Sequence, residues 1–272
     1  MRSTLLRILL FVIAAPATAG AFATFPDGSG GFLKWGDNAA GTPGGTVTWG
    51  FVPVGTDGSS YCGAACPGTS VSSIQIENGP GIGYTLTPLT DLVATFTAAF
   101  EAWAAAGNIT FTGPDPDGGL AINDPGATSP DIRIGVFAFS SGGGAVGFAP
   151  PPNGGTGAGD ILLDANSFYA FQPGNEGDAF PLASTAPNDI ESLILHEIGH
   201  ALGLAHPAFD GTCPVMQVEP SCLGIIQREL DPDDIAGVEF LYGVPIPEPG
   251  SGLLLGSGLL AIAAGARRMT SA

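Results

Sequence analysis

Residues 196–206 read HEIGHALGLAH, and they hold all three histidines of the 272-residue chain. On a helix, His196 and His200 lie one turn apart and project from the same face. Gly203 has no Cβ, so the chain can leave the helix there, turn back and deliver His206 as a third ligand. Three neutral imidazoles with a fourth position open to water form the ligand set of a catalytic zinc site. The alternative is an amphipathic helix with incidental histidines, and it requires this spacing to arise by chance.

Glu197 follows the first of these histidines, so its carboxylate can reach a water in the open coordination position. We therefore predict that Glu197 is a general base and serves chemistry, not metal binding. The pattern H-E-x-x-H-x-x-G-x-x-H resembles the signature of the metzincin metallopeptidases. That resemblance implies a methionine turn beneath the metal, and Met216, ten positions after His206, is the matching residue. Ordinary core packing of Met216 is compatible with this role.

Most of residues 45–243 resembles the matrixin branch of the metzincins, the peptidase M10 type. Residues 99–103 and 109–111 resemble the first helix and second strand of matrixins, residues 131–137 the next strand, and residues 230–243 the C-terminal helix. The resemblance implies an α+β fold, with a twisted, mainly parallel sheet of about five strands, two long helices and a small C-terminal subdomain with one helix. A peptide or protein substrate would lie across the cleft between these parts, added as a further strand to the sheet edge near residues 147–150.

Local patterns predict where several elements begin and end. Residues 45–54 alternate like a strand, whereas the Gly- and Ser-rich residues 55–83 are typical of an insertion loop. Residues 90–106 repeat apolar side chains at helical spacing, with Thr90 as the predicted cap and Gly107 as the end.

The helix that contains the histidines is predicted over residues 187–202. Asn188 is its expected N-cap, with Glu191 three residues on in the arrangement of a capping box. Asp231 is the expected cap of the C-terminal helix, because an aspartate side chain can accept from the free N–H groups of the first turn.

The resemblance also bears on further metals. Animal matrixins hold a second, structural zinc bound by histidines, but Val146 and Leu162 stand at the matching positions here. We therefore predict one catalytic Zn²⁺ and no second zinc. The family's calcium positions survive in part at Asp131 and Asp160, so Ca²⁺ binding is one interpretation, and solvated loop carboxylates are the other.

The chain is acidic, with a formal net charge of −18, and four of its seven basic residues lie near the two ends. Such a surface repels nucleic acid and anionic membranes. The four cysteines form two close pairs, and next to an export signal they predict the disulfides Cys62–Cys66 and Cys213–Cys222. A zinc site built from all four cysteines is the alternative, although neither pair has C-x-x-C spacing.

Both ends differ from the body at residues 20–243. Residues 1–19 resemble a secretory signal peptide, with two arginines, an apolar run and an A-x-A cleavage site. Residues 244–272 contain Pro-Glu-Pro, an apolar run and two arginines, and they resemble the PEP-CTERM sorting tail of bacteria. That resemblance implies processing by an exosortase-type enzyme. The apolar run is short for a stable span, which favours transient membrane association over a simple C-terminal anchor.

Together these patterns predict a secreted or surface-associated bacterial zinc endopeptidase that acts as a monomer. The alternative is a non-catalytic, zinc-binding extracellular or biofilm-matrix protein on the same fold. The presence of Glu197 argues against that alternative, because a protein that only binds needs no general base beside the metal.

Overall fold

The computed structural model describes residues 22–59, 68–79, 82–140, 143–153, 155–180 and 187–246. The predicted signal peptide at 1–19, the Cys62–Cys66 pair and nearly all of the predicted tail at 244–272 lie outside these described residues. Within the described part of the chain, no helix combines the length and the apolar character needed to cross a membrane.

A five-stranded sheet forms the base of the molecule. Its strands lie in the order β5-β2-β6-β8-β7. The bounds are β2 Gly45–Phe51, β5 Ile109–Thr112, β6 Ile132–Phe137, β7 Ala145–Gly147 and β8 Ile161–Asp164. The first four strands pair in parallel and β7 pairs antiparallel with β8, so the predicted mainly parallel sheet is confirmed.

The central strands β6 and β8 are buried along their whole length. Because successive side chains of a strand point to opposite faces, each strand supplies both sides of the sheet. Ile161 and Leu163 belong to the large core that includes the helices. Leu162 belongs to a smaller cluster with Val52, Ile122 and Phe137. The alternation therefore places this smaller cluster on the opposite face of the sheet.

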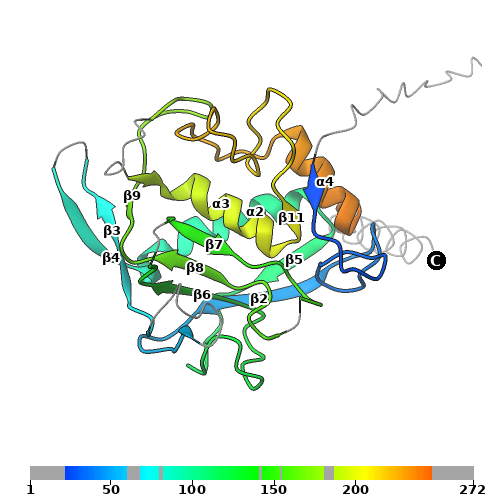
Figure 1. Cartoon of the computed structure of the whole chain (residues 1–272), viewed down its shortest axis with the longest axis horizontal. Coiled ribbons are helices and arrows are strands. Elements are labelled where there is room, and N and C mark those ends of the chain that lie inside the picture. Colours follow the sequence, from blue (N-terminus) through cyan, green and yellow to red (C-terminus); the bar gives the residue numbers. More distant parts are fainter. Residues whose placement is uncertain are drawn as a thin grey trace, which may run out of the picture.

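Two helices, α2 (Val93–Ala106) and α3 (Ile190–Ala201), lie on the same face of the sheet (Figure 1). The indole N–H of Trp103 on α2 donates to Leu195 O on α3 at 3.0 Å. Gly107 ends α2 as predicted, with its N–H donating to Trp103 O. Thr90 is not the cap: it lies in a 3-10 turn, η2 (Leu89–Leu92), that buries both of its leucines before α2 begins.

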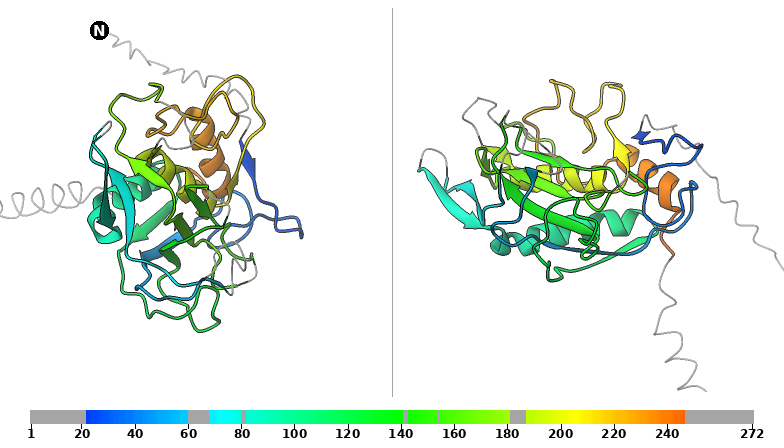
Figure 2. Two further views of the ribbon diagram at one scale, coloured as in Figure 1. Left: turned by 60° about the vertical axis from the view of Figure 1, so that its left-hand side comes forward. Right: turned by 60° about the horizontal axis from the view of Figure 1, so that its bottom comes forward.

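A second sheet was not predicted. Strands β3 (Ser73–Glu77), β4 (Tyr84–Pro88), β9 (Phe168–Ala170) and β10 (Asn188–Asp189) form it in the order β10-β9-β3-β4. The prediction of a loop over residues 55–83 was therefore wrong, because Ile74 and Ile76 are buried on alternate positions of β3. The β3–β4 hairpin stands at one end of the molecule (Figures 1 and 2).

The N-terminal segment and the last helix lie toward the opposite end (Figure 1). Strand β1 (Ala23–Thr24) pairs antiparallel with β11 (Leu204–Ala205), directly before His206. Helix α4 (Pro232–Tyr242) begins at Asp231, which forms a capping box with Asp234, and the predicted cap is confirmed.

Candidate active site

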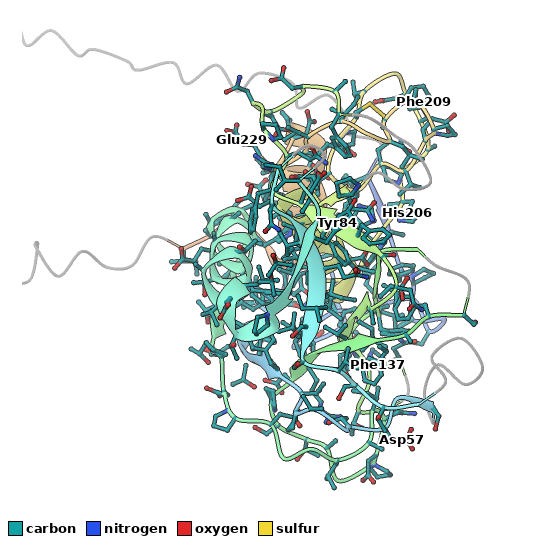
Figure 3. All side chains as sticks on the ribbon, turned by 90° about the vertical axis from the view of Figure 1, so that its left-hand side faces the viewer. Asp57, Tyr84, Phe137, His206, Phe209 and Glu229 are labelled. Carbon is teal, nitrogen blue, oxygen red and sulfur yellow. A yellow bond between two sulfur atoms is a disulfide. The ribbon has the colours of Figure 1, made fainter. Side chains whose placement is uncertain are left out.

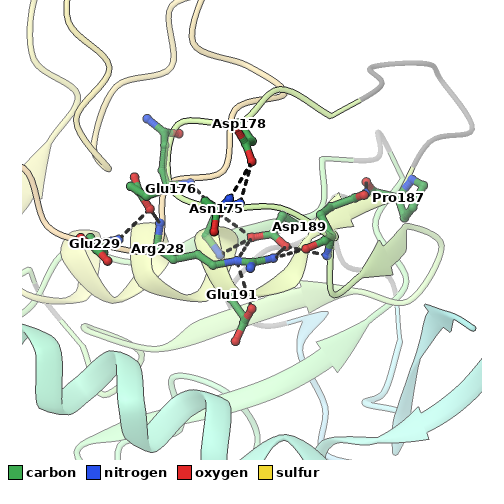
Figure 4. Close-up of polar contacts among 11 residues, drawn as sticks. Asn175, Glu176, Asp178, Pro187, Asp189, Glu191, Arg228 and Glu229 are labelled. Atoms are coloured by element: carbon green, nitrogen blue, oxygen red, sulfur yellow. Dashed lines mark hydrogen bonds and ion pairs between the residues drawn. The ribbon is translucent and has the colours of Figure 1, made fainter. Parts of the chain in front are cut away.

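Helix α3 is capped by Asp189, one residue after the predicted cap. The Asp189 carboxylate accepts from Ser192 N at 3.0 Å and from Ser192 Oγ at 2.6 Å. Asn188 instead donates its side-chain amide to Phe168 O, and Glu191 forms an ion pair with Arg228 (Figure 4). The predicted Asn188–Glu191 capping box was therefore wrong. A carboxylate that also accepts from a guanidinium makes stronger, charge-assisted hydrogen bonds than a neutral amide can.

The three histidines converge through their Nε2 atoms. His206 Nε2 lies 3.1 Å from His196 Nε2 and 2.9 Å from His200 Nε2. His196 Nδ1 lies 2.7 Å from Val215 O, and His200 Nδ1 lies 2.8 Å from Leu204 O. Because a carbonyl oxygen only accepts, these two Nδ1 atoms must donate, and their Nε2 lone pairs both point into the cluster.

This donor set fits a metal ion. Among the described residues, the three histidines form a group whose ligand atoms lie within 4.8 Å of one another. A tetrahedral zinc with ordinary Zn–N bonds places its nitrogen ligands about 3.3 Å apart, close to the separations here. Burial lowers the pKa of His196 to about 3 and that of His200 to about 4, so both rings are neutral near pH 7, as metal binding requires.

His206 reaches the cluster because the chain reverses at Gly203. Gly203 has φ +99°, and a Cβ there would lie 2.1 Å from Leu33 O. Its N–H donates to His200 O at 2.9 Å, and β11 then leads to His206. Phe25, next to β1, lines the cleft and places its ring centroid 6.0 Å from that of His200. The N-terminal segment therefore supports this turn, a contact that no pattern in the sequence indicated.

Glu197 is 5% exposed and is fixed by the edge strand of the main sheet. Its Oε2 accepts from Gly147 N at 2.5 Å. Burial raises the pKa of Glu197 to about 7, against the opposing effect of this hydrogen bond. A Cβ on Gly147 would lie 2.3 Å from Glu197 O, so only glycine lets β7 approach α3 this closely. The contact between Gly147 and Glu197 was not predicted, although a glycine within a strand pattern indicates a close approach of another part of the backbone.

Met216 packs against the helix that contains the histidines. A Cβ on Gly199 would lie 2.2 Å from Met216 Sδ, so the glycine makes room for the thioether. The Asp234 carboxylate accepts from Val215 N at 2.8 Å and from Met216 N at 3.1 Å. Asp234 on α4 therefore holds the turn that presents Met216, and this link was not predicted from the sequence.

A disulfide closes the loop around Met216. Cys213 and Cys222 are bonded, with their Cα atoms 5.4 Å apart and a separation of nine positions in sequence. Cys222 is buried and lines the cleft. The bond therefore fixes the segment that passes beneath and beside the histidines.

Replacing both Cys213 and Cys222 by alanine is expected to lower the free energy of unfolding by roughly 2–3 kcal/mol, because the unfolded chain gains the freedom of the opened loop. Denaturant titration of the wild type and the double variant measures this difference. Equal unfolding midpoints and slopes in the two proteins would contradict the expectation.

The two aspartates predicted for calcium lie in separate settings. Asp131 Oδ2 accepts from Thr48 N and Thr48 Oγ1, both at 2.8 Å. Asp160 Oδ1 accepts from Arg133 N at 2.9 Å, and its Oδ2 has no hydrogen-bond partner among the described residues. Burial raises the pKa of Asp160 to about 8. In the described part of the chain, neither aspartate lies within a group of three or more His, Cys, Asp or Glu side chains close enough to share an ion.

A cleft of about 680 Å³ contains the three histidines and Glu197. When the molecule is viewed from the end that carries the β3–β4 hairpin, His206 is seen below Phe209 and above Phe137 (Figure 3). Several of the side chains that line the cleft are apolar. They include Leu193, Val215, Val218, Leu223 and Ile225.

The family model for matrixin, a peptidase M10 model, matches residues 83–243. The chain belongs to the matrixin family. Matrixins use zinc, and the histidine cluster of this matrixin lies within the matched region, as do Glu197 and Met216.

Several named proteins are similar to this matrixin. Metalloendoproteinase 2-MMP of Arabidopsis thaliana is 30% identical over 167 residues, which cover 57% of this chain and 38% of that protein. Metalloendoproteinase 1 of Glycine max is 31% identical over 40% of this chain and 32% of its own length. Stromelysin-1 of Rattus norvegicus is 34% identical over 34% of this chain and 20% of its own length. The matched part therefore spans well under half of each of these relatives.

Proposed function

We propose that this matrixin is a zinc-dependent endopeptidase. The observation that supports this most directly is the convergence of three Nε2 lone pairs, with two Nδ1 atoms fixed by carbonyls, beside a buried carboxylate. The similar plant proteins are named metalloendoproteinases, which agrees with the proposal.

His196, His200 and His206 would hold the zinc. Zinc, when bound, polarises the scissile carbonyl and acidifies a water in the open position. Gly147 N donates to one carboxylate oxygen of Glu197, Oε2, and Glu197 lines the cleft. Oε1 would take the proton of the attacking water and pass it to the leaving amine. Burial raises the pKa of Glu197, so the carboxylate accepts a proton more readily than an exposed one does.

The substrate would bind as an extended strand along β7. Strand β7 is the last strand of the main sheet. Gly144 O accepts from Asp164 N and Phe148 N donates to Asp160 O, so the backbone groups of Ala145 and Gly147 face away from β8. The N–H groups of these two residues already donate to Gly143 O and to Glu197 Oε2, so their carbonyl oxygens are the groups that would accept from a substrate peptide. An extended peptide can pair with such an edge. The apolar side chains that line the cleft support an apolar side chain after the cleaved bond.

Three measurements on purified protein test this function. Elemental analysis is expected to give one zinc per chain, and the zinc-loaded protein is expected to cleave casein. A chelator should abolish cleavage, and added zinc should restore it, because the three histidines alone cannot polarise the carbonyl. Fully loaded protein that cleaves no substrate would favour the non-catalytic alternative. Two zincs per chain would contradict the single-site prediction.

We further propose that the protein is secreted or held at the cell surface of a bacterium, as a monomer. The export pattern at 1–19 and the PEP-CTERM-like pattern at 244–272 support this, and an exosortase-type enzyme would process the tail after transient membrane association. The acidic charge supports the absence of a nucleic-acid partner. Calcium binding at Asp131 and Asp160 stays a prediction.

A further inference from the structure

Two antiparallel segments, residues 177–180 and 224–227, form part of the wall of the cleft. We call these two segments the pocket wall, and the apolar part of the cleft that they border the apolar pocket. Phe180 N donates to Gly224 O at 2.7 Å, and Ile226 N donates to Asp178 O at 2.9 Å. Phe180, Gly224 and Ile225 line the cleft. Ile226 is buried. Polar groups at the end of the pocket wall join it to the rest of the site.

Gln227 provides the first of two polar attachments. Its N–H donates to Ser192 Oγ at 2.9 Å. Its side-chain amide donates to Cys213 O at 2.8 Å and to Pro214 O at 2.7 Å. These bonds tie the pocket wall to α3 and to the start of the methionine turn. They do not fix its other strand, residues 177–180.

Arg228 provides the second attachment and reaches both strands (Figure 4). Its Nε and Nη2 donate to the two oxygens of Asp189, at 2.9 and 2.5 Å. Nη2 also donates to Gln172 O at 2.8 Å, on the segment that leads into residues 177–180. The backbone N–H of Arg228 donates to Glu176 Oε2 at 2.6 Å, directly before that strand, and this bond does not depend on the arginine side chain. The Asp189 side chain is fully buried and caps α3.

We propose that Arg228 is a specificity-determining residue: by joining the pocket wall to the N-cap of α3, it fixes the size of the apolar pocket and so selects the side chain that follows the cleaved bond. This inference rests on the proposed peptidase function. Arg228 acts by positioning the wall and does not itself line the cleft. A planar guanidinium holds two carboxylate oxygens in one geometry, which a lysine or an apolar side chain cannot reproduce.

The test compares wild type with Arg228→Met and Arg228→Lys on two peptides that differ only in the residue after the cleaved bond, leucine in one and tryptophan in the other. The fixed pocket is expected to favour leucine. Without the bidentate pair the wall can move outward, so the kcat/KM ratio of leucine to tryptophan should fall on the order of 10-fold in Arg228→Met. The change should appear mainly in KM. The ratio for Arg228→Lys should lie between those of wild type and Arg228→Met. If Arg228→Met does not fold, the comparison of wild type with Arg228→Lys is the test.

Asp117→Asn is the matched control. It weakens the other buried ion pair, Arg133–Asp117, in which both side chains are fully buried and neither lines the cleft. It should lower the Tm and leave the leucine-to-tryptophan ratio unchanged. Zinc content is measured for every variant, so that loss of metal is not mistaken for altered selectivity.

Two results would overturn the inference: an unchanged ratio in both Arg228 variants, or an equal change in Asp117→Asn, which would indicate general loosening. If zinc-loaded wild type cleaves neither peptide, the proposed function fails separately. Calorimetric Kd values of the same two peptides then decide the inference, since a fixed pocket wall predicts the same shift in their ratio.

Discussion

Glu197→Ala is expected to retain one zinc per chain and to lose nearly all peptide cleavage. All three histidines remain, and alanine is the best helix former, so α3 should keep its shape. General-base help contributes roughly 10²–10⁴-fold to rate, and this carboxylate would act both on the water and on the leaving amine. Zinc content and kcat/KM on one peptide are the two measurements.

Two further variants separate the possible roles of Glu197. Glu197→Gln keeps an oxygen for the Gly147 N–H bond but cannot take a proton, so it should resemble Glu197→Ala in rate. His200→Ala removes a ligand and should release the metal. Near-normal cleavage by either Glu197 variant would refute the mechanism, and zinc loss as complete as in His200→Ala would reassign Glu197 to holding the metal site.

The features that the sequence predicted well depend on neighbours in the chain. The pairing of His196 with His200 follows from one helical turn, and the strand expected over residues 131–137 is present as β6. Asp231 caps α4 through groups within three residues of itself. Such patterns are complete within a short window, so they can be recognised without knowledge of the fold.

The features that were missed depend on partners far away in sequence. Asp189, not Asn188, caps α3. Its carboxylate pairs with Arg228, which lies 39 positions later in the sequence. Strand β3 is short and lies among Gly and Ser, and its parallel pairing with β9 joins distant segments. Gly147 N donates to the carboxylate of Glu197, which lies 50 positions later in the sequence. Composition indicated a loop over residues 55–83, but burial of two isoleucines decided the structure.

The positions of the ligands therefore depend on contacts that surround the motif as well as on the motif itself. Asp234 on α4 holds the backbone of Val215 and Met216, and Val215 O in turn orients His196. On the other side, Leu33 lies against the Gly203 turn. A substitution that keeps every ligand can thus still disturb the metal centre through this supporting layer.

Gly203→Ala is expected to weaken zinc binding and to destabilise the fold, although it removes no ligand. At φ +99° an alanine is strained by roughly 1–2 kcal/mol. Its Cβ would also lie 2.1 Å from Leu33 O, a backbone atom that cannot rotate away, so the turn must shift at a further cost of ~1–3 kcal/mol. Because β11 follows directly, the shift should move His206 away from the other two ligands.

Gly211→Ala is the matched control, because Gly211 has φ +101° and nothing within 4 Å of the position of its Cβ. It carries the same backbone strain without the collision and lies outside the ligand helix. Denaturant unfolding and zinc competition against a chelator compare the two variants. The collision predicts that Gly203→Ala loses more stability than Gly211→Ala and also loses zinc affinity, which Gly211→Ala should keep. Equal losses in both would show that the Gly203 turn yields without moving His206, and the dependence of the third ligand on this glycine would then be wrong.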